Sequence, residues 1–263
     1  MTMHIAPVFS IVVSTHRRPA ILERALQSLL AQSFRDFEIV LVADEGTAAT
    51  KEVASRLLRE TDVFLCLPGA KGPAESRNAG VQLARGRFIL FLDDDDSYRS
   101  DFLQAIVQCN RFRSDAVNYV SYSQVREMRT AESTQVISST DIDMSGTDIR
   151  GLLVSNFIPN NTIILSSSIA KRHLVDAALQ SHEDWDYLIS LVVKYDFNFL
   201  GISGPVVHIN EGQSRNNDAK SQGSIALDYL SIYRKWPASD DDLRLRRKEM
   251  LRTLGLDLPP AML

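Results

Sequence analysis

The sequence predicts an α/β protein built on a Rossmann-like sheet flanked by helices, with a small helical extension at the carboxyl end. Two observations lead to this class. Over the first hundred residues, short apolar runs alternate with segments in which apolar residues recur at helical spacing. The runs are apolar throughout rather than at every second position, which is typical of parallel strands covered by helices on both faces of the sheet.

The predicted elements of the first part alternate regularly. Strands are expected at 9–14, 37–43, 62–68 and 87–92, and helices at 19–32, 50–60, 75–86 and 101–113. Pro19 suits the first turn of the first helix, because proline lacks the backbone N–H that this position leaves without a partner in any case. Gly86 is expected to close the third helix.

After residue 113 the alternation becomes irregular. The predicted strands lie at 116–128, 161–166 and 197–209, and the predicted helices at 167–179 and 185–195. A polar stretch from about 216 leads to two amphipathic helices, at 224–236 and 242–256. We therefore expect one domain over residues 1–222, with halves of about 1–113 and 114–222, and a helical extension over 223–263.

Composition restricts the compartment and the partners. The formal net charge of −4 gives no overall reason to bind a polyanion, so nucleic acid is not an expected partner. Cys66 and Cys109 lack metal-ligand spacing, which predicts free thiols in a reducing compartment. The amino end resembles neither a signal peptide nor a transmembrane helix, and the predicted location is the cytoplasm.

Polar residues follow three of the predicted strands. They are Ser14 to Arg17, then Asp44 and Glu45, then Asp93 to Asp96. In open α/β sheets, ligands bind outside the carboxyl ends of the strands, so we expect these residues to line one site.

The four aspartates at 93–96 repel one another unless a cation is present, because each charge raises the pKa of its neighbours. A divalent ion such as Mg²⁺ or Mn²⁺ removes the conflict and completes its shell with water and phosphate oxygens. The alternative is a solvated acidic turn before the helix at 101–113.

Four segments of the chain resemble glycosyltransferase family 2. They are "FSIVVSTHRRPAILERALQSLLAQSFRDFEIVLVADEGT", "GPAESRNAGVQLARGRFILFLDDDD", "NFIPNNTIIL" and "HEDWDYLISL", and they span about residues 8–215. The resemblance implies a GT-A fold with a mixed sheet, a nucleotide-binding first half and an acceptor-binding second half. It further implies inverting transfer from a nucleotide-sugar donor to a hydroxyl of a saccharide or lipid-linked acceptor, by a hexosyl- or N-acetylhexosaminyltransferase of bacterial surface polysaccharide synthesis.

The resemblance assigns the nucleotide to the first two strand ends. Ser14, His16 and Arg17 match the nucleotide-binding turn, in which Ser14 and His16 fall where the base is commonly contacted. Asp44 matches the aspartate that accepts the uracil N3 hydrogen. The family usually has two adjacent aspartates followed by Gly-Ser at this position, whereas this chain has Ala43 before Asp44 and Glu45 after it. A UDP-sugar is the expected donor.

The diphosphate and the metal are assigned to residues further along. Arg77 matches an arginine near the diphosphate, where a permanently charged guanidinium can bond two oxygens. Asp93 and Asp94 are predicted to contact the nucleotide, and Asp95 and His208 to bind Mn²⁺ or Mg²⁺. The alternatives are a surface cation on a helix for Arg77 and a structural histidine for His208.

The "HEDWD" segment supplies the predicted general base, Asp184. Inverting transfer needs a carboxylate opposite the leaving diphosphate to take the acceptor hydroxyl proton. Glu183 and Asp186 compete for this role, and helix capping is the alternative for each acidic residue here. The candidate acceptor-binding residues are Asn160, Asn161 and Trp185, although turn formation explains the two asparagines equally well.

A basic segment, "LRLRRKEMLR", lies in the last predicted helix. An interfacial helix would suit a lipid-linked acceptor and would place the protein at the inner face of the membrane. A packed helix with a solvated basic face is the alternative.

Two other functions are consistent with parts of this pattern. A sugar-phosphate nucleotidyltransferase would also use an α/β sheet and an acidic metal site, but it should have a glycine-rich phosphate loop, which "STHRRPA" lacks. A catalytically silent nucleotide-sugar-binding domain is the second alternative. The acidic tetrad together with the Glu183–Asp184 pair argues against it.

Overall fold

The structure is a computed structural model that describes residues 6–69, 71–130, 133–179, 181–212 and 222–263. Its strands are β1 (Phe9–Thr15), β2 (Phe37–Asp44), β3 (Val63–Leu67), β4 (Phe88–Asp93), β5 (Ser97–Tyr98), β6 (Val117–Arg129), β7 (Thr134–Ile142), β8 (Ile163–Ser166) and β9 (Phe197–Asn210). Its α-helices are α1 (Pro19–Leu30), α2 (Ala48–Leu57), α3 (Pro73–Leu83), α4 (Phe102–Gln108), α5 (Ser167–Arg172), α6 (Glu183–Val192), α7 (Gln222–Lys235) and α8 (Asp241–Thr253). Short 3₁₀ turns cover Ile149–Leu153, Asn160–Thr162 and Pro260–Met262.

The strands form one mixed sheet in the order β3-β2-β1-β4-β8-β6-β9-β5, and β7 pairs with the later part of β6. The first four strands in this order are parallel. β8 runs antiparallel to both β4 and β6, and β9 runs parallel to β6. The predicted α/β class is confirmed, with a parallel Rossmann-like half joined to a mixed second half.

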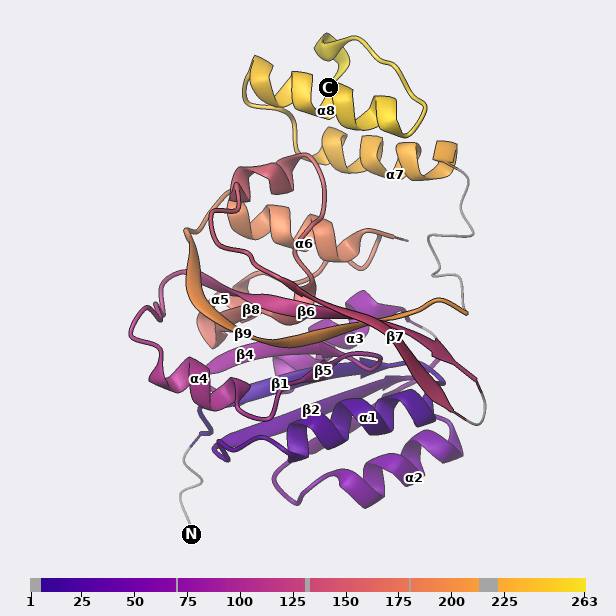
Figure 1. Cartoon of the computed structure of the whole chain (residues 1–263), viewed down its shortest axis with the longest axis vertical. Coiled ribbons are helices and arrows are strands. Elements are labelled where there is room, and N and C mark those ends of the chain that lie inside the picture. The colour runs from indigo at the N-terminus through magenta and orange to yellow at the C-terminus, as the bar shows by residue number, and fades with distance from the viewer. Residues whose placement is uncertain (1–5, 70, 131–132, 180, 213–221) are drawn as a thin grey trace.

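Helices cover both faces of the parallel half, which explains why its strands are apolar throughout. Along β1, Ile11 and Val13 pack in one core cluster with α1, α2 and α4. Val12 points to the opposite cluster, with α3, α5 and α6. Figure 1 shows α1 and α2 below the sheet and α6 above it. Alternate side chains of one strand therefore enter two different cores.

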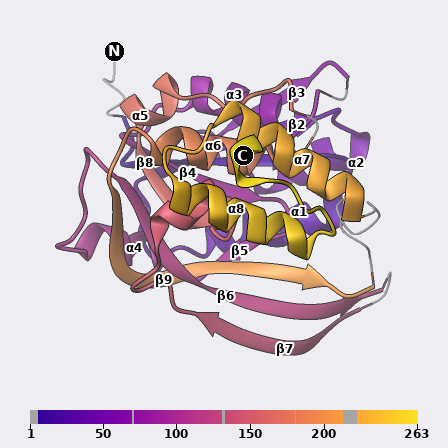
Figure 2. The ribbon, with the colours of Figure 1, turned by 90° about the horizontal axis from the view of Figure 1, so that it is seen from above.

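The carboxyl-terminal helices lie on α6 rather than on the sheet (Figures 1 and 2). Trp185 and Ile189 of α6 are fully buried in a cluster that includes Tyr229 and Tyr233 of α7 and Leu251 of α8. The opposite face of α6 packs on the sheet. Helix α6 is thus buried on two sides. The two predicted helices of the extension are present, and the boundary at 222 stays a prediction.

The basic side chains of α8 are engaged within the protein. Arg247 is fully buried, donates to the carbonyl oxygen of Leu153 at 2.9 Å, and lies 4.3 Å from the ring centroid of Tyr233. The other basic residues pair with carboxylates: Arg244 with Asp241, Arg246 with Asp148, Lys248 with Asp257 and Arg252 with Glu249. The helix is packed, and these contacts give no support to the predicted membrane surface. None of the helices in the described ranges is both long and apolar enough to cross a membrane.

Two strands were not predicted. β7 is exposed at every residue from 134 to 141 and pairs with β6, so it carries no buried stripe that a pattern could reveal. β5 has only two residues, and its pairing with β9 defines it. The segment 134–142, which lies outside every predicted element, is therefore an exposed strand.

Two predicted helices are shorter than expected. Helix α4 ends at Gln108 instead of residue 113. Helix α5 ends at Arg172 instead of residue 179. The Asn78 side chain accepts from the backbone N–H of Val175 and donates to its carbonyl oxygen, both at 2.8 Å, and so removes Val175 from helical pairing. Asn78 lies 97 residues away, which is why local periodicity did not predict the end. Cys66 and Cys109 are free thiols, as predicted.

Candidate active site

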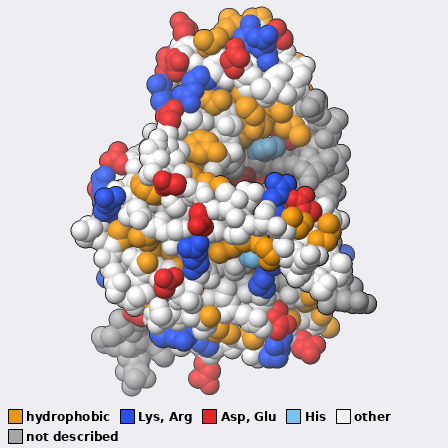
Figure 3. Space-filling model, in the orientation of Figure 1, with side chains coloured by type: hydrophobic (Ala, Val, Ile, Leu, Met, Phe, Trp, Pro, Cys, Tyr) orange, Lys and Arg blue, Asp and Glu red, His pale blue; other side chains and the backbone are white. Residues whose placement is uncertain are grey.

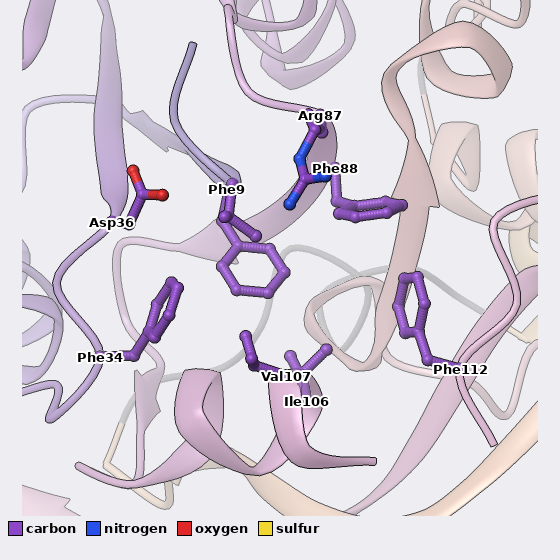
Figure 4. A pocket seen from close by; sticks show the side chains of 9 residues that line it. Phe9, Phe34, Asp36, Arg87, Phe88, Ile106, Val107 and Phe112 are labelled. Carbon is purple, nitrogen blue, oxygen red and sulfur yellow. The ribbon is translucent and has the colours of Figure 1, made fainter. Parts of the chain in front are cut away.

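The predicted strand-end residues meet at the carboxyl edge of the parallel strands. Ser14 is paired with Asp93 across β1 and β4, and Thr15 with Ala43, the residue before Asp44. Figure 3 shows the surface hollowed below the uppermost helices, with hydrophobic and histidine side chains in the hollow. A separate aromatic cavity of about 350 Å³ lies where β1 and β4 begin, at the opposite edge of the sheet (Figure 4). That cavity is not part of this site.

The acidic turn, residues 93–96, alternates between exposed and buried carboxylates. The side chains of Asp93 and Asp95 are 34% and 33% exposed. Asp94 and Asp96 are buried. The two partly exposed carboxylates are therefore the first and third of the four, and each is paired with an arginine. Metal binding by Asp95 stays a prediction.

Asp94 is held inside the protein. It accepts from the Thr15 hydroxyl at 2.7 Å and from the Arg18 guanidinium. Burial raises the pKa of Asp94 to about 6, although Arg18 and Thr15 oppose this shift. The predicted contact between Asp94 and a nucleotide is wrong, because this side chain has no exposed surface.

Asp96 ties the acidic turn to two distant segments. Its carboxylate accepts from the Asn161 side chain at 2.8 Å and from the backbone N–H of His208 at 2.9 Å. The Tyr98 hydroxyl also donates to the backbone oxygen of Asn161, at 3.3 Å. These contacts fix the turn against β9 and the segment before β8.

Arg77 links the acidic turn to α6. It is 7% exposed and donates to Asp93 at 3.0 Å and to Glu183 at 2.9 Å. A guanidinium presents its donors in a rigid fork, so a single side chain can hold both carboxylates. The alternative of a surface cation is wrong, since Arg77 is buried between the two acidic segments.

Asp184 lies in the first turn of α6. Its carboxylate accepts from the backbone N–H of Trp185 at 2.7 Å and from the Asn156 side chain at 3.1 Å. Burial raises the pKa of Asp184, and the charge of Glu183 adds to this, while Arg77 opposes it. A carboxylate with a raised pKa is a better proton acceptor than an ordinary aspartate.

The two competitors for the base have other partners. Glu183 is paired with Arg77. Asp186 is buried and accepts from Lys235 and from the Trp236 indole, both at 2.8 Å, so it anchors α7 to α6. Because these partners engage both carboxylates, neither is available to accept a proton from an acceptor hydroxyl.

The predicted base-contacting residues form a network at the ends of β1 and β2. The Nδ1 atom of His16 lies 2.7 Å from the carbonyl oxygen of Asp44, and Arg17 pairs with Glu45. The Asp44 carboxylate accepts from the backbone N–H groups of Lys71 and Gly72, at 2.6 and 2.9 Å. Gly72 has φ 88°, a conformation that glycine adopts without strain.

Residues with a strained backbone conformation lie around the same site. The non-glycine residues with positive φ in the described ranges are Arg17, Glu45 and His182, with values of 51°, 66° and 59°. The first two follow β1 and β2, and His182 directly precedes α6. Such residues cost of order 1–3 kcal/mol each, and they cluster at functional sites.

His208 lies on β9 with both ring nitrogens occupied. Nε2 is 2.9 Å from the Ser97 hydroxyl, and Nδ1 is 3.1 Å from Glu127. Burial and Arg24 lower the pKa of His208, which favours the neutral ring. Burial disfavours the charged form of Glu127, but hydrogen bonds from Arg24 and Arg129 lower the pKa of Glu127 to about 2.

The donor atoms here fit a divalent ion that shares its shell with substrate. The described part of the chain holds no group of three or more His, Cys, Asp or Glu side chains arranged to bind an ion. Asp95 offers a partly exposed carboxylate, and Mg²⁺ commonly uses one or two carboxylates with water and substrate phosphate. The Ser97 hydroxyl would have to turn away before His208 could contribute.

The predicted acceptor residues are less accessible than expected. Trp185 is fully buried, and its indole donates to the carbonyl oxygen of Leu152 at 2.6 Å, so the expected contact with an acceptor is wrong. Asn161 is buried and holds Asp96. Asn160 is also buried, and neither of its amide atoms has a hydrogen-bond partner among the described residues. A role of Asn160 toward an acceptor stays a prediction.

Several residues at the site were not predicted. Arg18 neutralises the acidic turn, Asn156 holds Asp184, and Glu127 contacts His208. Arg18 and Asn156 lie within the quoted "STHRRPA" and "NFIPNNTIIL" segments, where strand-end and turn positions were the available signal. Glu127 lies near the end of a long strand of mixed apolar and polar residues, and nothing in the local sequence distinguishes it.

Residues 10–170 match the family model described as "Glycosyl transferase family 2". The chain belongs to glycosyl transferase family 2. The match runs from β1 to α5 and includes the acidic turn and Arg77, whereas Asp184 and His208 lie beyond it.

The chain is similar to several bacterial glycosyltransferases. The GalNAc(5)-diNAcBac-PP-undecaprenol beta-1,3-glucosyltransferase of Campylobacter jejuni is 36% identical over 105 residues, which is 39% of this chain and 34% of that protein. The amylovoran biosynthesis glycosyltransferase AmsB of Erwinia amylovora is 26% identical over 208 residues, which is 76% of this chain and 68% of that protein. The chain thus spans about a third of the first relative's length.

Solved structures share the GT-A fold of this family. The structure of S. aureus TarS 1–349 in complex with UDP-GlcNAc matches with a TM-score of 0.61 and 19% identity, covering 95% of this chain and 73% of that one. At this identity the similarity concerns the fold. The predicted GT-A fold is confirmed.

Proposed function

We propose that the chain is an inverting glycosyltransferase that transfers a hexosyl or N-acetylhexosaminyl group from a nucleotide-diphosphate donor to a hydroxyl of a saccharide or lipid-linked acceptor. The observation that carries the proposal is the Arg77 bridge, which joins Asp93 of the acidic turn to Glu183 beside the candidate base. The bridge joins the acidic turn, which is proposed to lie near the leaving diphosphate, to α6, which carries the proposed general base. Membership of the family supports this reading.

The reaction requires one displacement at the anomeric carbon. The acceptor oxygen forms a bond to that carbon as the bond to the diphosphate oxygen breaks, and Asp184 takes the proton of the acceptor hydroxyl. Asn156 and the backbone N–H of Trp185 orient this carboxylate. Arg77 is placed to stabilise charge on the departing diphosphate once Asp93 or Glu183 releases one arm of its fork.

Mn²⁺ or Mg²⁺ is the proposed cofactor, with Asp95 and His208 as its protein ligands. When bound, such an ion neutralises charge on the leaving diphosphate. Ser14, His16, Arg17 and Asp44 are proposed to contact the nucleotide, and UDP is favoured by the UDP-GlcNAc complex of the structural neighbour. The name of the Erwinia relative supports a role in bacterial polysaccharide synthesis. A bacterial surface polysaccharide as product and a cytoplasmic location are part of the proposal.

The test separates nucleotide binding from transfer. UDP and the UDP-sugars of glucose, galactose, GlcNAc and GalNAc are screened for a rise in Tm with and without Mn²⁺, because a ligand that binds only the folded state stabilises it. UDP release is then followed with saccharide acceptors. Asp184→Asn should retain the rise in Tm and lose about 10²- to 10⁴-fold in rate. Asp95→Ala should lose the Mn²⁺-dependent part of the rise.

Asp36→Asn, an exposed residue at the opposite edge of the sheet, is the matched control and should leave both measurements unchanged. Transfer by Asp184→Asn at the wild-type rate would refute the base assignment. Tight binding of UDP-sugars without turnover would favour the silent binding domain, and release of pyrophosphate from UTP and a sugar phosphate would favour the nucleotidyltransferase.

A further inference from the structure

Glu127 lies at the centre of a buried charged network beside the candidate metal site. It is 1% exposed on β6, and it accepts from Arg24 at 2.8 Å and from Arg129. Its second oxygen, Oε2, lies 3.1 Å from Nδ1 of His208, which is 81 residues away along the chain. A carboxylate paired with two guanidinium groups is an anion, so it can accept hydrogen bonds and cannot donate one.

This contact determines which nitrogen of His208 carries the proton. Because Glu127 only accepts, Nδ1 of the neutral ring must carry the proton and donate it to Oε2. Nε2 then has a free lone pair, and the Ser97 hydroxyl, at 2.9 Å, donates to it. The lone pair is therefore directed at the Ser97 hydroxyl, and Ser97 is the residue after the acidic turn.

The same network also holds the backbone of the acidic turn. Arg24, which is bound to Glu127, donates through its other terminal nitrogen to the carbonyl oxygen of Asp95 at 2.5 Å. On the other side, the backbone N–H of His208 donates to Asp96 at 2.9 Å. Glu127 is therefore connected to both sequence-predicted metal ligands, to one through its ring and to the other through Arg24.

We infer that Glu127 is a positioning residue that holds His208 in the Nδ1–H tautomer, with Nε2 available to a divalent cation, and aligns Asp95 through Arg24. This inference rests on the proposed function, in which His208 and Asp95 hold the cation. A carboxylate on the far nitrogen of a histidine ligand is a common arrangement around protein-bound metals, and its loss weakens metal binding about 10- to 100-fold.

The tautomer is measured in the metal-free protein by long-range ¹H–¹⁵N correlation of the histidine ring, with His208→Gln to assign the signals. Wild-type protein should show a protonated Nδ1 and an unprotonated Nε2. In Glu127→Gln, the amide oxygen should accept hydrogen bonds from Arg24 and Arg129, so the NH₂ group should face Nδ1 and donate to it. The proton should then move to Nε2.

Affinity is measured by electron paramagnetic resonance of Mn²⁺ in the presence of saturating UDP. Glu127→Gln should weaken Mn²⁺ binding about 10- to 100-fold. Asp141→Asn, an exposed carboxylate on the neighbouring strand β7, is the matched control and should leave the affinity unchanged.

Two outcomes would overturn the inference, and a third would refute the proposed metal site instead. An Nε2–H tautomer in wild-type protein would overturn the inference even if Glu127→Gln failed to fold. Unchanged Mn²⁺ affinity in a folded Glu127→Gln protein would overturn it as well. Failure of wild-type protein to bind Mn²⁺ with UDP would instead refute the proposed metal site, while the tautomer would still report whether Glu127 orients the ring.

Discussion

Asp93 and Asp95 face solvent at the acidic turn, while Asp94 and Asp96 are buried and hydrogen-bonded. Four adjacent carboxylates can coexist here because each has its own donors: Arg77 for the first, Arg18 for the second and third, and Asn161 for the fourth. The turn is thus held in shape by its buried members. Its partly exposed members, Asp93 and Asp95, are held only by Arg77 and Arg18.

Asp94 makes stability depend on pH in a defined window. Burial raises the pKa of Asp94 to about 6, so the folded protein binds this proton more tightly than the unfolded chain, in which the pKa is about 3.9. As pH rises from about 4 to about 6, the unfolded chain releases the proton first, and wild-type protein loses stability. Asp94→Asn has no titratable group at this position, so its stability lacks this dependence on pH.

The check is urea unfolding in EDTA at several pH values between 4 and 8. The free energy of unfolding of wild-type protein minus that of Asp94→Asn should fall by up to about 3 kcal/mol between pH 4 and 6, and then stay level. A difference that does not change with pH would contradict the assignment of the shifted pKa to Asp94.

At the scale of elements, the contact between α3 and β1 places Arg77 at the site. Gly80 lies on α3, one turn after Arg77, and a Cβ there would lie 2.4 Å from Cγ1 of Val12 on β1. The glycine therefore permits close approach of helix and strand. This approach brings Arg77 within reach of Asp93, at the end of the neighbouring strand β4.

Gly80→Ala should destabilise the protein by about 1–3 kcal/mol through overpacking, despite the better helix propensity of alanine. Denaturant unfolding measures the cost. Val12→Ala supplies the matched background, since removal of the clashing methyl groups should make Gly80→Ala much less costly there. An equal cost in both backgrounds would show that the contact with Val12 is not the cause.

At the scale of the whole molecule, the extension completes the core around α6, the helix of Asp184. Trp185, next to Asp184, is covered by Tyr229 at a ring-centroid distance of 4.6 Å. Asp186 binds Lys235 and Trp236. The helix that carries the candidate base is therefore held between the sheet and α7.

Removal of residues 223–263 should expose Trp185 to water and lower the Tm. The chain has two tryptophans, so the truncated protein retains Trp185 alone. Its fluorescence emission should shift to the red. Full-length Trp236→Phe, which also retains Trp185 alone, is the control and should emit in the blue. Blue emission from the truncated protein would show that the extension does not shield Trp185.

The sequence alone determined the α/β class, most helices and strands, and the edge at which the site lies. These features depend on periodicity within one segment and on the rule that parallel strands end at one edge of a sheet. Asp44 and Asp93 could be placed at that edge because each directly follows a predicted strand, and Asp95 lies two residues after Asp93. The resemblance to the family supplied Arg77, Asp184 and His208.

The tertiary structure decided which of these side chains face solvent and which partners they have. Adjacent aspartates look alike in sequence, but the direction of each carboxylate is fixed by groups brought in from elsewhere, such as Asn161 for Asp96. Trp185 is buried because α7 covers it, and Glu127 reaches His208 across 81 residues. Burial and hydrogen bonding between distant segments depend on how whole elements pack, and this packing cannot be inferred from a local sequence pattern.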